Sequence, residues 1–143
     1  MALTAADKIE IHELVARYNR AIDTGQAEDW AATFTADGEF EGVVGHYKGT
    51  AELVAFVREY SSNPKYAEFR VGQHWVNNLI IDGDENEATL FCHQLMIRPG
   101  AGAAEINLMG WYDDRLRKEN GAWRFVKRKV NPVMTSDQWV APK

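Results

Sequence analysis

The apolar positions near the start of the chain recur at helical spacing and define one face of an amphipathic helix: Ile11, Leu14, Val15, Tyr18 and Ile22. Thr4 followed three residues later by Asp7 is typical of a capped helix start. Gly25 suits the left-handed conformation that often ends a helix. We therefore expect one helix of about five turns that ends near Asp23. A negative charge at that end is disfavoured by the helix dipole, so Asp23 needs a compensating partner.

Further elements follow at short intervals: a helix over residues 28–34, a strand over 39–44, a turn with a short strand over 45–49, and a helix from 50 that fades at 61–64. Trp30 and Phe34 share one side of the second helix. Thr50 is a suitable cap for the third helix, which we expect to bury Phe56.

The period then changes to that of strands over residues 69–82, 88–98, 106–117 and 123–130. The connections are short, so neighbouring strands are expected to be antiparallel. Three helices before a run of antiparallel strands predict a single α+β domain over residues 1–143, with the helices packed on one face of a curved sheet. Such an arrangement encloses a pocket between helices and sheet.

The strand over residues 71–82 combines apolar and polar positions. Strict alternation places His74, Val76, Asn78 and Ile80 on one face and Trp75, Asn77, Leu79 and Ile81 on the other. We expect both faces to be covered, with His74 and Asn78 directed into largely apolar surroundings. A buried imidazole needs a partner, and that partner is either structural or part of a reaction.

Composition narrows the classes of function. The chain is 45% hydrophobic and 26% charged, as in ordinary globular proteins, and its formal net charge is −5. An acidic chain is a poor match for nucleic acid or for an anionic membrane as main partner. The basic run at residues 124–129 alternates between two strand faces, which favours a solvated or interface strand over a nucleic-acid site. The single cysteine, Cys92, cannot form an intrachain disulfide, and no targeting or spanning segment is recognisable, so we expect a cytoplasmic protein.

Neither a metal nor an organic cofactor is expected. The four histidines lack the close spacing of a helical metal site: His12, His46, His74 and His93. The glycines at 100 and 102 join strand to strand, which provides no helix N-terminus for a phosphate.

Five segments, taken in order, resemble the SnoaL-like branch of the nuclear-transport-factor-2-like (NTF2-like) superfamily: R-Y-N-R-A-I-D-T-G, D-W-A-A-T-F-T-A-D-G-E-F, G-H-Y-K-G, Q-H-W-V-N-N-L-I-I-D-G-D and G-A-W-R-F-V-K-R-K-V. The resemblance extends over essentially the full chain. It implies a cone in which a strongly bent, mostly antiparallel sheet surrounds an apolar cavity. It also implies self-association as a homo-oligomer, either a dimer or a trimer.

The resemblance also implies roles for particular residues. Dehydratases and a dehydrochlorinase of this superfamily carry a strand His and an Asp at the end of the first helix, which fall here on His74 and Asp23. Bile acid dehydratases are similar in placing a Tyr five residues before the Asp, here Tyr18. A second cavity His in scytalone dehydratase has His93 as a loose counterpart. We further predict contacts to substrate from a set of polar and aromatic residues: Asn78, Arg128, Trp30, Phe40 and Phe56.

This pattern predicts a small lyase or isomerase in which a His–Asp dyad removes a proton from a hydrophobic ring compound. His74 is the predicted general base, Asp23 orients it and Tyr18 assists through its hydroxyl. Two other classes stay open: a non-catalytic ligand-binding domain like the small subunits of ring-hydroxylating dioxygenases, and an epoxide hydrolase. The latter needs an Arg flanked by carboxylates, whereas Asp113 and Asp114 are expected at strand ends. In a purely structural interpretation, His74 is a satisfied buried histidine and Asp23 a surface residue.

Overall fold

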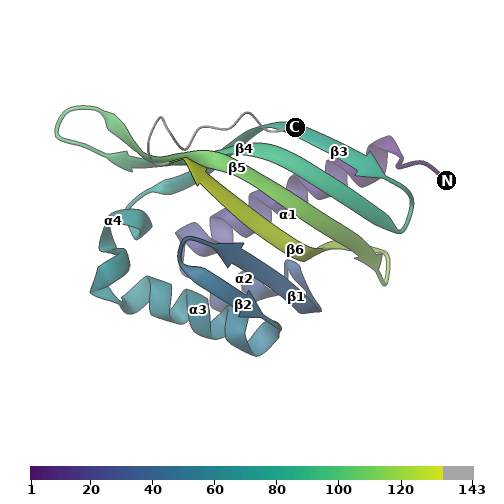
Figure 1. Ribbon diagram of the computed structural model, residues 1–143, viewed down its shortest axis with the longest axis horizontal. Coiled ribbons are helices and arrows are strands. Elements are labelled where there is room, and N and C mark those ends of the chain that lie inside the picture. Colours follow the sequence, from purple (N-terminus) through teal and green to yellow (C-terminus); the bar gives the residue numbers. More distant parts are fainter. Residues whose placement is uncertain (134–143) are drawn as a thin grey trace.

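A single six-stranded sheet organises the protein, as seen in a computed structural model that describes residues 1–133 (Figure 1). Its spatial order is β2-β1-β6-β5-β4-β3. The strands are β1 (Phe34–Gly42), β2 (Gly45–Lys48), β3 (Gln73–Gly83), β4 (Glu87–Pro99), β5 (Ala104–Glu119) and β6 (Ala122–Val133). All neighbours are antiparallel except β1 and β6, which run parallel. In this order β1 lies beside β6, the last strand of the chain, while β2 and β3 form the two edges of the sheet.

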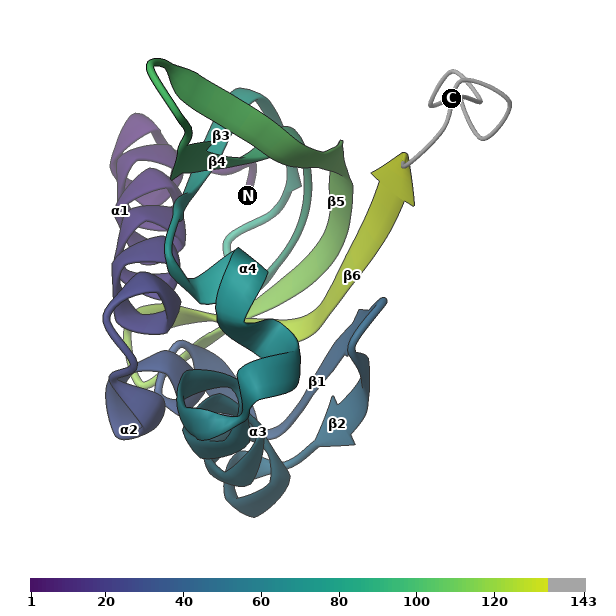
Figure 2. The ribbon, with the colours of Figure 1, turned by 90° about the vertical axis from the view of Figure 1, so that its left-hand side faces the viewer.

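The helices are α1 (Ala5–Asp23), α2 (Ala27–Ala31), α3 (Thr50–Ser62), a 3₁₀ turn (Pro64–Tyr66) and α4 (Ala67–Arg70). The Thr4 and Asp7 side chains form a reciprocal capping box at the start of α1. Figure 2 shows the sheet bent into an arch, with α1 along one side, α2 and α3 below, and α4 at the open end. The α+β prediction with helices on one face of a curved sheet is therefore confirmed.

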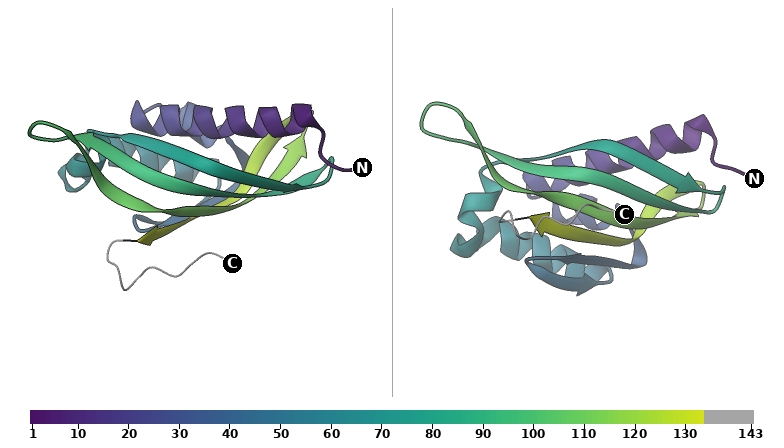
Figure 3. Two further views of the ribbon diagram at one scale, coloured as in Figure 1. Left: turned by 90° about the horizontal axis from the view of Figure 1, so that it is seen from above. Right: turned by 45° about the horizontal axis from the view of Figure 1, so that its top comes forward.

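The other face of β3, β4 and β5 is not covered by any helix of residues 1–133 (Figure 3, left). Trp75, Ile80 and Met109 expose 56%, 58% and 41% of their surface, respectively. The expectation that both faces of β3 are covered was wrong for residues 1–133. Within residues 1–133, no helix has both the length and the apolar character needed to cross a bilayer.

The core is an aromatic cluster under the arch. Trp30 is fully buried, with its ring centroid 5.1 Å from that of Phe34, 5.4 Å from Phe40 and 5.6 Å from Phe56. Tyr18 of α1 packs on the same cluster, 5.3 Å from Trp30. Aromatic burial of this kind is a large contribution to stability, since each ring removes about 150–250 Å² from water. It also fixes α1, α2 and α3 against the sheet.

Several predicted boundaries were wrong. The second helix ends at Ala31, and Phe34 begins β1 instead of closing the helix. The apolar spacing around Phe34 is compatible with a helix or a strand. Phe34 belongs to the strand because it pairs with Phe125 of β6. β3 begins at Gln73, because residues 64–70 form helical turns that the strand-like composition did not indicate.

A bulge in β3 reverses the predicted faces of that strand. Asn77 pairs with His93 of β4 and Ile80 with Phe91, so three steps on β3 oppose two on β4. Asn78 takes a positive φ of 55° to accommodate the extra residue. Beyond the bulge Ile81 is buried and Ile80 faces outward, opposite to strict alternation.

Candidate active site

His74 and Asp23 lie in direct contact, although 51 residues separate them in the chain. The His74 ring Nδ1 is 2.6 Å from Oδ1 of Asp23. The backbone N–H of His74 donates to the same carboxylate, at 3.2 Å to Oδ1 and 3.1 Å to Oδ2. The two side chains are only 10% and 17% exposed. The structure thus joins the end of α1 to the start of β3 through one carboxylate.

This contact explains how α1 can end in an acidic residue. Asp23 is the last residue of α1, where the helix dipole disfavours a negative charge. The backbone N–H and the ring N–H of His74 supply the donors that compensate for it. In this arrangement the carboxylate holds the proton on Nδ1 and leaves Nε2 as the ring nitrogen able to accept one.

A cavity lies between α1, α3 and the concave face of the sheet, and His74 is part of its wall. All four of the aromatic residues predicted to matter there also line it: Tyr18, Trp30, Phe40 and Phe56. Its volume is about 50 Å³. A cavity of about 150 Å³ is known to take up benzene, so a ring enters here only after wall side chains move. Val43 and Phe69 stand at this wall and are, respectively, exposed and half-buried.

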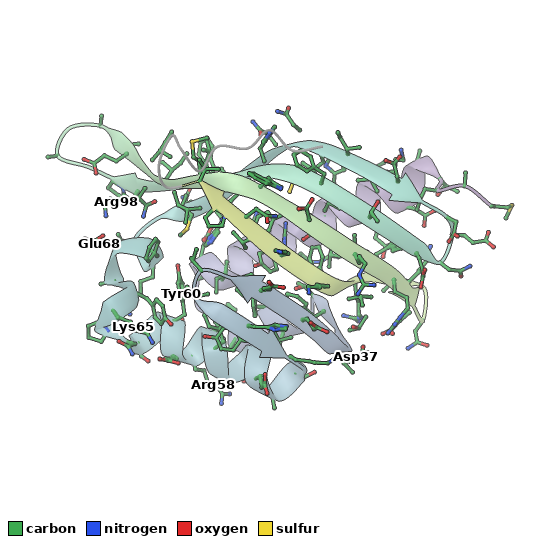
Figure 4. The ribbon with its side chains drawn as sticks, viewed as in Figure 1. Asp37, Arg58, Tyr60, Lys65, Glu68 and Arg98 are labelled. Atoms are coloured by element: carbon green, nitrogen blue, oxygen red, sulfur yellow. The ribbon has the colours of Figure 1, made fainter. Side chains whose placement is uncertain are left out.

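Three tyrosines place hydroxyl-bearing rings in the cavity wall: Tyr18, Tyr60 and Tyr112. Burial raises the pKa of each hydroxyl well above its ordinary value. At Tyr60 of α3, labelled in Figure 4, the negative charge of Asp23 raises the pKa further. All three therefore stay protonated near neutral pH and can donate hydrogen bonds. The predictions omitted Tyr60 and Tyr112, although Tyr60 continues the apolar stripe of α3 at helical spacing.

Arg128 is completely buried and is not among the described residues that line the cavity. Its guanidinium carbon lies 4.2 Å from the centre of the Tyr18 ring and 3.7 Å from that of Tyr112. Its Nε is 3.3 Å from Oδ1 of Asp114, which is also completely buried. Arg128 thus stands behind the two tyrosines that reach the cavity, and any effect on a ligand passes through them.

Asp114 lies in the middle of β5 and not at a strand end, so its predicted position was wrong. Burial raises the pKa of its carboxyl to about 7, although Arg128 acts in the opposite direction. The Arg–carboxylate pair required by the epoxide-hydrolase alternative therefore exists in part, as a single carboxylate beside Arg128.

Asn78 and His93 lie outside the cavity, on the uncovered face of the sheet. The Asn78 side-chain nitrogen is 3.1 Å from Nδ1 of His93, and Asn78 is exposed. The next residue of β4, Gln94, is 3% exposed and lines the cavity instead. His93, the loose counterpart of a second cavity histidine, is thus one position away from the inward-facing residue. An error of one residue in strand register exchanges the two faces of a strand.

Residues 1–133 hold no cluster of three or more His, Cys, Asp or Glu side chains placed to bind a metal ion.

Cys92 is buried, and burial raises the pKa of its thiol to about 11. Arg98 of β4 and Glu68 of α4, side by side in Figure 4, form an ion pair at 3.6 Å that ties α4 to the sheet.

The curved sheet, its helices and the cavity between them define a small α+β domain of the NTF2-like type. The sequence profile of the SnoaL-like domain matches residues 4–129, and the chain belongs to that family. A Nostoc punctiforme protein of unknown function with a cystatin-like fold is 30% identical, with a TM-score of 0.82 over 93% of this chain and 96% of that one.

Two proteins of Novosphingobium aromaticivorans are also similar to this chain, each at 25% identity. One is an NTF2-like protein with a cystatin-like fold, with a TM-score of 0.76 over 87% of this chain and 80% of that one. The other is a candidate scytalone dehydratase, with a TM-score of 0.74 over 95% of this chain and 90% of that one. The predicted family and fold are thereby confirmed, and the family together with the dehydratase-type neighbour supports a small enzyme-like domain.

Proposed function

We propose that the protein is a lyase or isomerase that removes a proton from a carbon atom of a hydrophobic ring compound, without metal or organic cofactor. The observation that carries this proposal is the 2.6 Å contact between His74 Nδ1 and Asp23 Oδ1 at the wall of an apolar cavity. A carboxylate bound to one ring nitrogen fixes the tautomer and stabilises the imidazolium that forms when the other nitrogen takes up a proton.

In the proposed reaction, Nε2 of His74 accepts a proton from a carbon next to a carbonyl or similar activating group. The electron pair of the broken C–H bond forms a C=C bond to the carbonyl carbon, and the carbonyl π pair moves onto its oxygen. In an elimination, the pair on oxygen returns, a C=C bond forms to the carbon beyond, the leaving group departs from that carbon with the pair of its own bond, and the proton on Nε2 passes to the leaving group or to water. In an isomerisation, the proton returns to a different carbon. General base catalysis of this kind contributes about 10²- to 10⁴-fold.

Tyr18 is the proposed hydrogen-bond donor to the oxygen on which negative charge develops. Its hydroxyl stays protonated because burial raises its pKa, and its ring is fixed by Trp30 and by the Arg128 guanidinium. A neutral donor held in a water-poor wall stabilises developing charge better than water does.

Small cyclic ketones provide a direct test, since the natural substrate is not needed to detect proton abstraction. The protein would be incubated in D₂O with 3-hydroxycyclohexanone, 3-hydroxy-1-tetralone or cyclohex-3-enone, and NMR would follow deuterium exchange, elimination and isomerisation together. We expect exchange at the activated carbon with wild type and its loss in His74→Ala. Equal rates for wild type and His74→Ala on all three ketones would overturn the proposal and favour a non-catalytic ligand-binding domain.

A further inference from the structure

The wall of the cavity carries an amide group that the proposed reaction does not use. Gln94 of β4 is 3% exposed, lines the cavity, and its Oε1 has no hydrogen-bond partner. A buried polar atom without a partner costs about 1–3 kcal/mol, and a ligand group that pairs with it would offset that cost. Met96 and Leu108, which lie close to it on the sheet, are apolar, and none of the tyrosine hydroxyls in the same wall bonds its Oε1.

We propose that Gln94 is a specificity-determining residue that binds an oxygen substituent of the ligand ring, so that the protein selects hydroxylated or keto ring compounds over purely hydrocarbon or halogenated ones. The inference deepens the proposed function, since it concerns the ligand of the same cavity. A ring hydroxyl can donate to the free Oε1. If the amide is rotated so that its NH₂ occupies that place, the same hydroxyl or a carbonyl can accept from it.

The strand register places Gln94 suitably with respect to His74. His74 of β3 pairs with Met96 of β4, and Val76 pairs with Gln94. His74 and Gln94 are therefore diagonal neighbours on the concave face, a relationship that corresponds to about 7–8 Å between the two positions. Once the wall side chains have moved to admit a ring, its reacting carbon would lie toward the imidazole and its oxygen toward the amide.

A halogenated or hydrocarbon ring would leave Oε1 of Gln94 buried and unpaired in the complex. Sites that hydrogen-bond a substrate hydroxyl discriminate strongly against analogues that lack it, because the protein group then loses both water and partner. Of the ring classes compatible with an apolar cavity, the oxygenated one is thus the class that Gln94 selects.

The test compares phenol with toluene, which have similar shapes and differ in the hydroxyl. Binding to the whole protein would be measured by NMR titration in wild type, in Gln94→Leu and in Met96→Leu. Met96→Leu is the matched control, since it changes an apolar residue of the same cavity two positions along the same strand. We expect the ratio of phenol to toluene affinity to fall by about five- to tenfold in Gln94→Leu and to stay within about twofold in Met96→Leu.

Stability gives a second readout that a purely structural role would not produce. Removing the unpaired Oε1 of Gln94 should leave the melting temperature of Gln94→Leu unchanged or higher, whereas removing a structural hydrogen bond should lower it. An unchanged affinity ratio in Gln94→Leu, or no binding of either probe to wild type at millimolar concentration, would overturn the inference. Phenol and toluene do not react. If wild type failed to turn over the cyclic ketones, that would therefore refute the proposed reaction without changing the measured ratio of phenol to toluene affinity.

Discussion

Asp23 holds His74 at two points, since its carboxylate accepts the backbone N–H of His74 and lies 2.6 Å from the ring Nδ1. Both the position of the residue and the orientation of its imidazole thus depend on one side chain from the end of α1. The backbone contact attaches β3 to α1, whereas the ring contact selects the tautomer. Substitutions can separate these two effects.

Asp23→Asn should keep an oxygen for the backbone N–H of His74 while removing the negative charge that stabilises an imidazolium. We expect turnover of a reactive ketone to fall by about 10²- to 10⁴-fold with little change in melting temperature. Ring nitrogen chemical shifts of His74 would report the tautomer. Asp29→Asn, at an exposed position of α2, is the matched control. An unchanged tautomer and rate in Asp23→Asn would show that the contact is only structural.

Tyr18→Phe removes a hydroxyl and keeps the ring that packs on Trp30 and Arg128. If the hydroxyl donates to developing negative charge, the rate should fall by about 10- to 10³-fold while the protein stays folded. Tyr18→Ala is the contrasting variant, since loss of a buried aromatic ring should cost about 3–5 kcal/mol of unfolding free energy. Chemical denaturation and ketone turnover would be measured on both variants. A rate for Tyr18→Phe equal to that of wild type would exclude the hydroxyl from the reaction.

The next prediction concerns Asp7, which lies away from the cavity and is expected to stabilise the folded protein. Its Oδ1 lies 2.7 Å from Lys118 Nζ and accepts from Trp123 Nε1 at 3.0 Å, while Oδ2 accepts from Thr4. These donors lower the pKa of Asp7, with Lys118 the largest cause. Asp7→Asn should lower the unfolding free energy at neutral pH, because the charge-assisted hydrogen bonds from Lys118, Trp123 and Thr4 are weakened.

The pH dependence of this effect has a defined sign. A carboxyl with a lowered folded pKa contributes stability that is present above its unfolded value near pH ~4 and is lost as the pH falls through the folded pKa. The difference between wild type and Asp7→Asn should therefore be largest near neutrality and shrink in acid. Urea denaturation across this range would measure it, and a difference that grew in acid would contradict the assignment.

Asp114 should show the opposite trend. Burial raises the pKa of this carboxyl to about 7, so the folded state retains a proton that the unfolded state releases from about pH 4 upward. Its contribution to stability is greatest in acid and declines as the pH rises toward 7. Relative to wild type, Asp114→Asn should gain unfolding free energy across that window. A difference independent of pH would show that Arg128 keeps Asp114 ionised throughout.

The uncovered sheet face is where we expect a second copy of the chain to bind. A row of apolar side chains crosses three strands there, as the pairing of Trp75 with Leu95 and of Leu95 with Met109 shows. Charges of both signs are present nearby, since Asp113 of β5 lies opposite Lys129 of β6 in the strand register, so the face is not uniformly repulsive toward itself. Burial of exposed apolar surface in a self-complementary contact would favour a symmetric oligomer.

Ile80→Glu should weaken this association, because it places a charge in the apolar face. Val71→Glu is the control, since Val71 has the same exposed fraction, 58%, but lies outside the sheet. Sedimentation velocity over a range of concentrations would measure both variants. A wild type that stays monomeric, or equal effects of the two substitutions, would contradict this placement of the interface.

Individual elements show where prediction from sequence succeeded and where it failed. Helix α1 was predicted with its cap at Thr4 and its end at Asp23, because a long periodic segment with capping residues is a local signal. The direction of the Asp23 side chain was not predicted, since helical spacing places it away from the middle of the apolar stripe. Its partner is in a strand that begins 50 residues later, at Gln73.

Strand faces were the least predictable feature. Asn78 was expected beside His74, but the bulge at Asn78 moves it to the outer face. Gln94 and His93 exchange roles for a similar reason, since inward and outward positions differ by one residue of register. Such choices depend on hydrogen bonding to the neighbouring strand, which no local pattern encodes.

The sequence by itself determined the α+β class, the family and the order of the longer helices and strands, because periodicity, caps and turn residues act over a few neighbouring positions. It also pointed to His74, Asp23 and Tyr18 through their resemblance to relatives. Only the tertiary structure decided that His74 and Asp23 touch and that Gln94 faces the cavity. Contacts between distant segments depend on how whole faces pack and on strand register, and both are set by the fold as a unit.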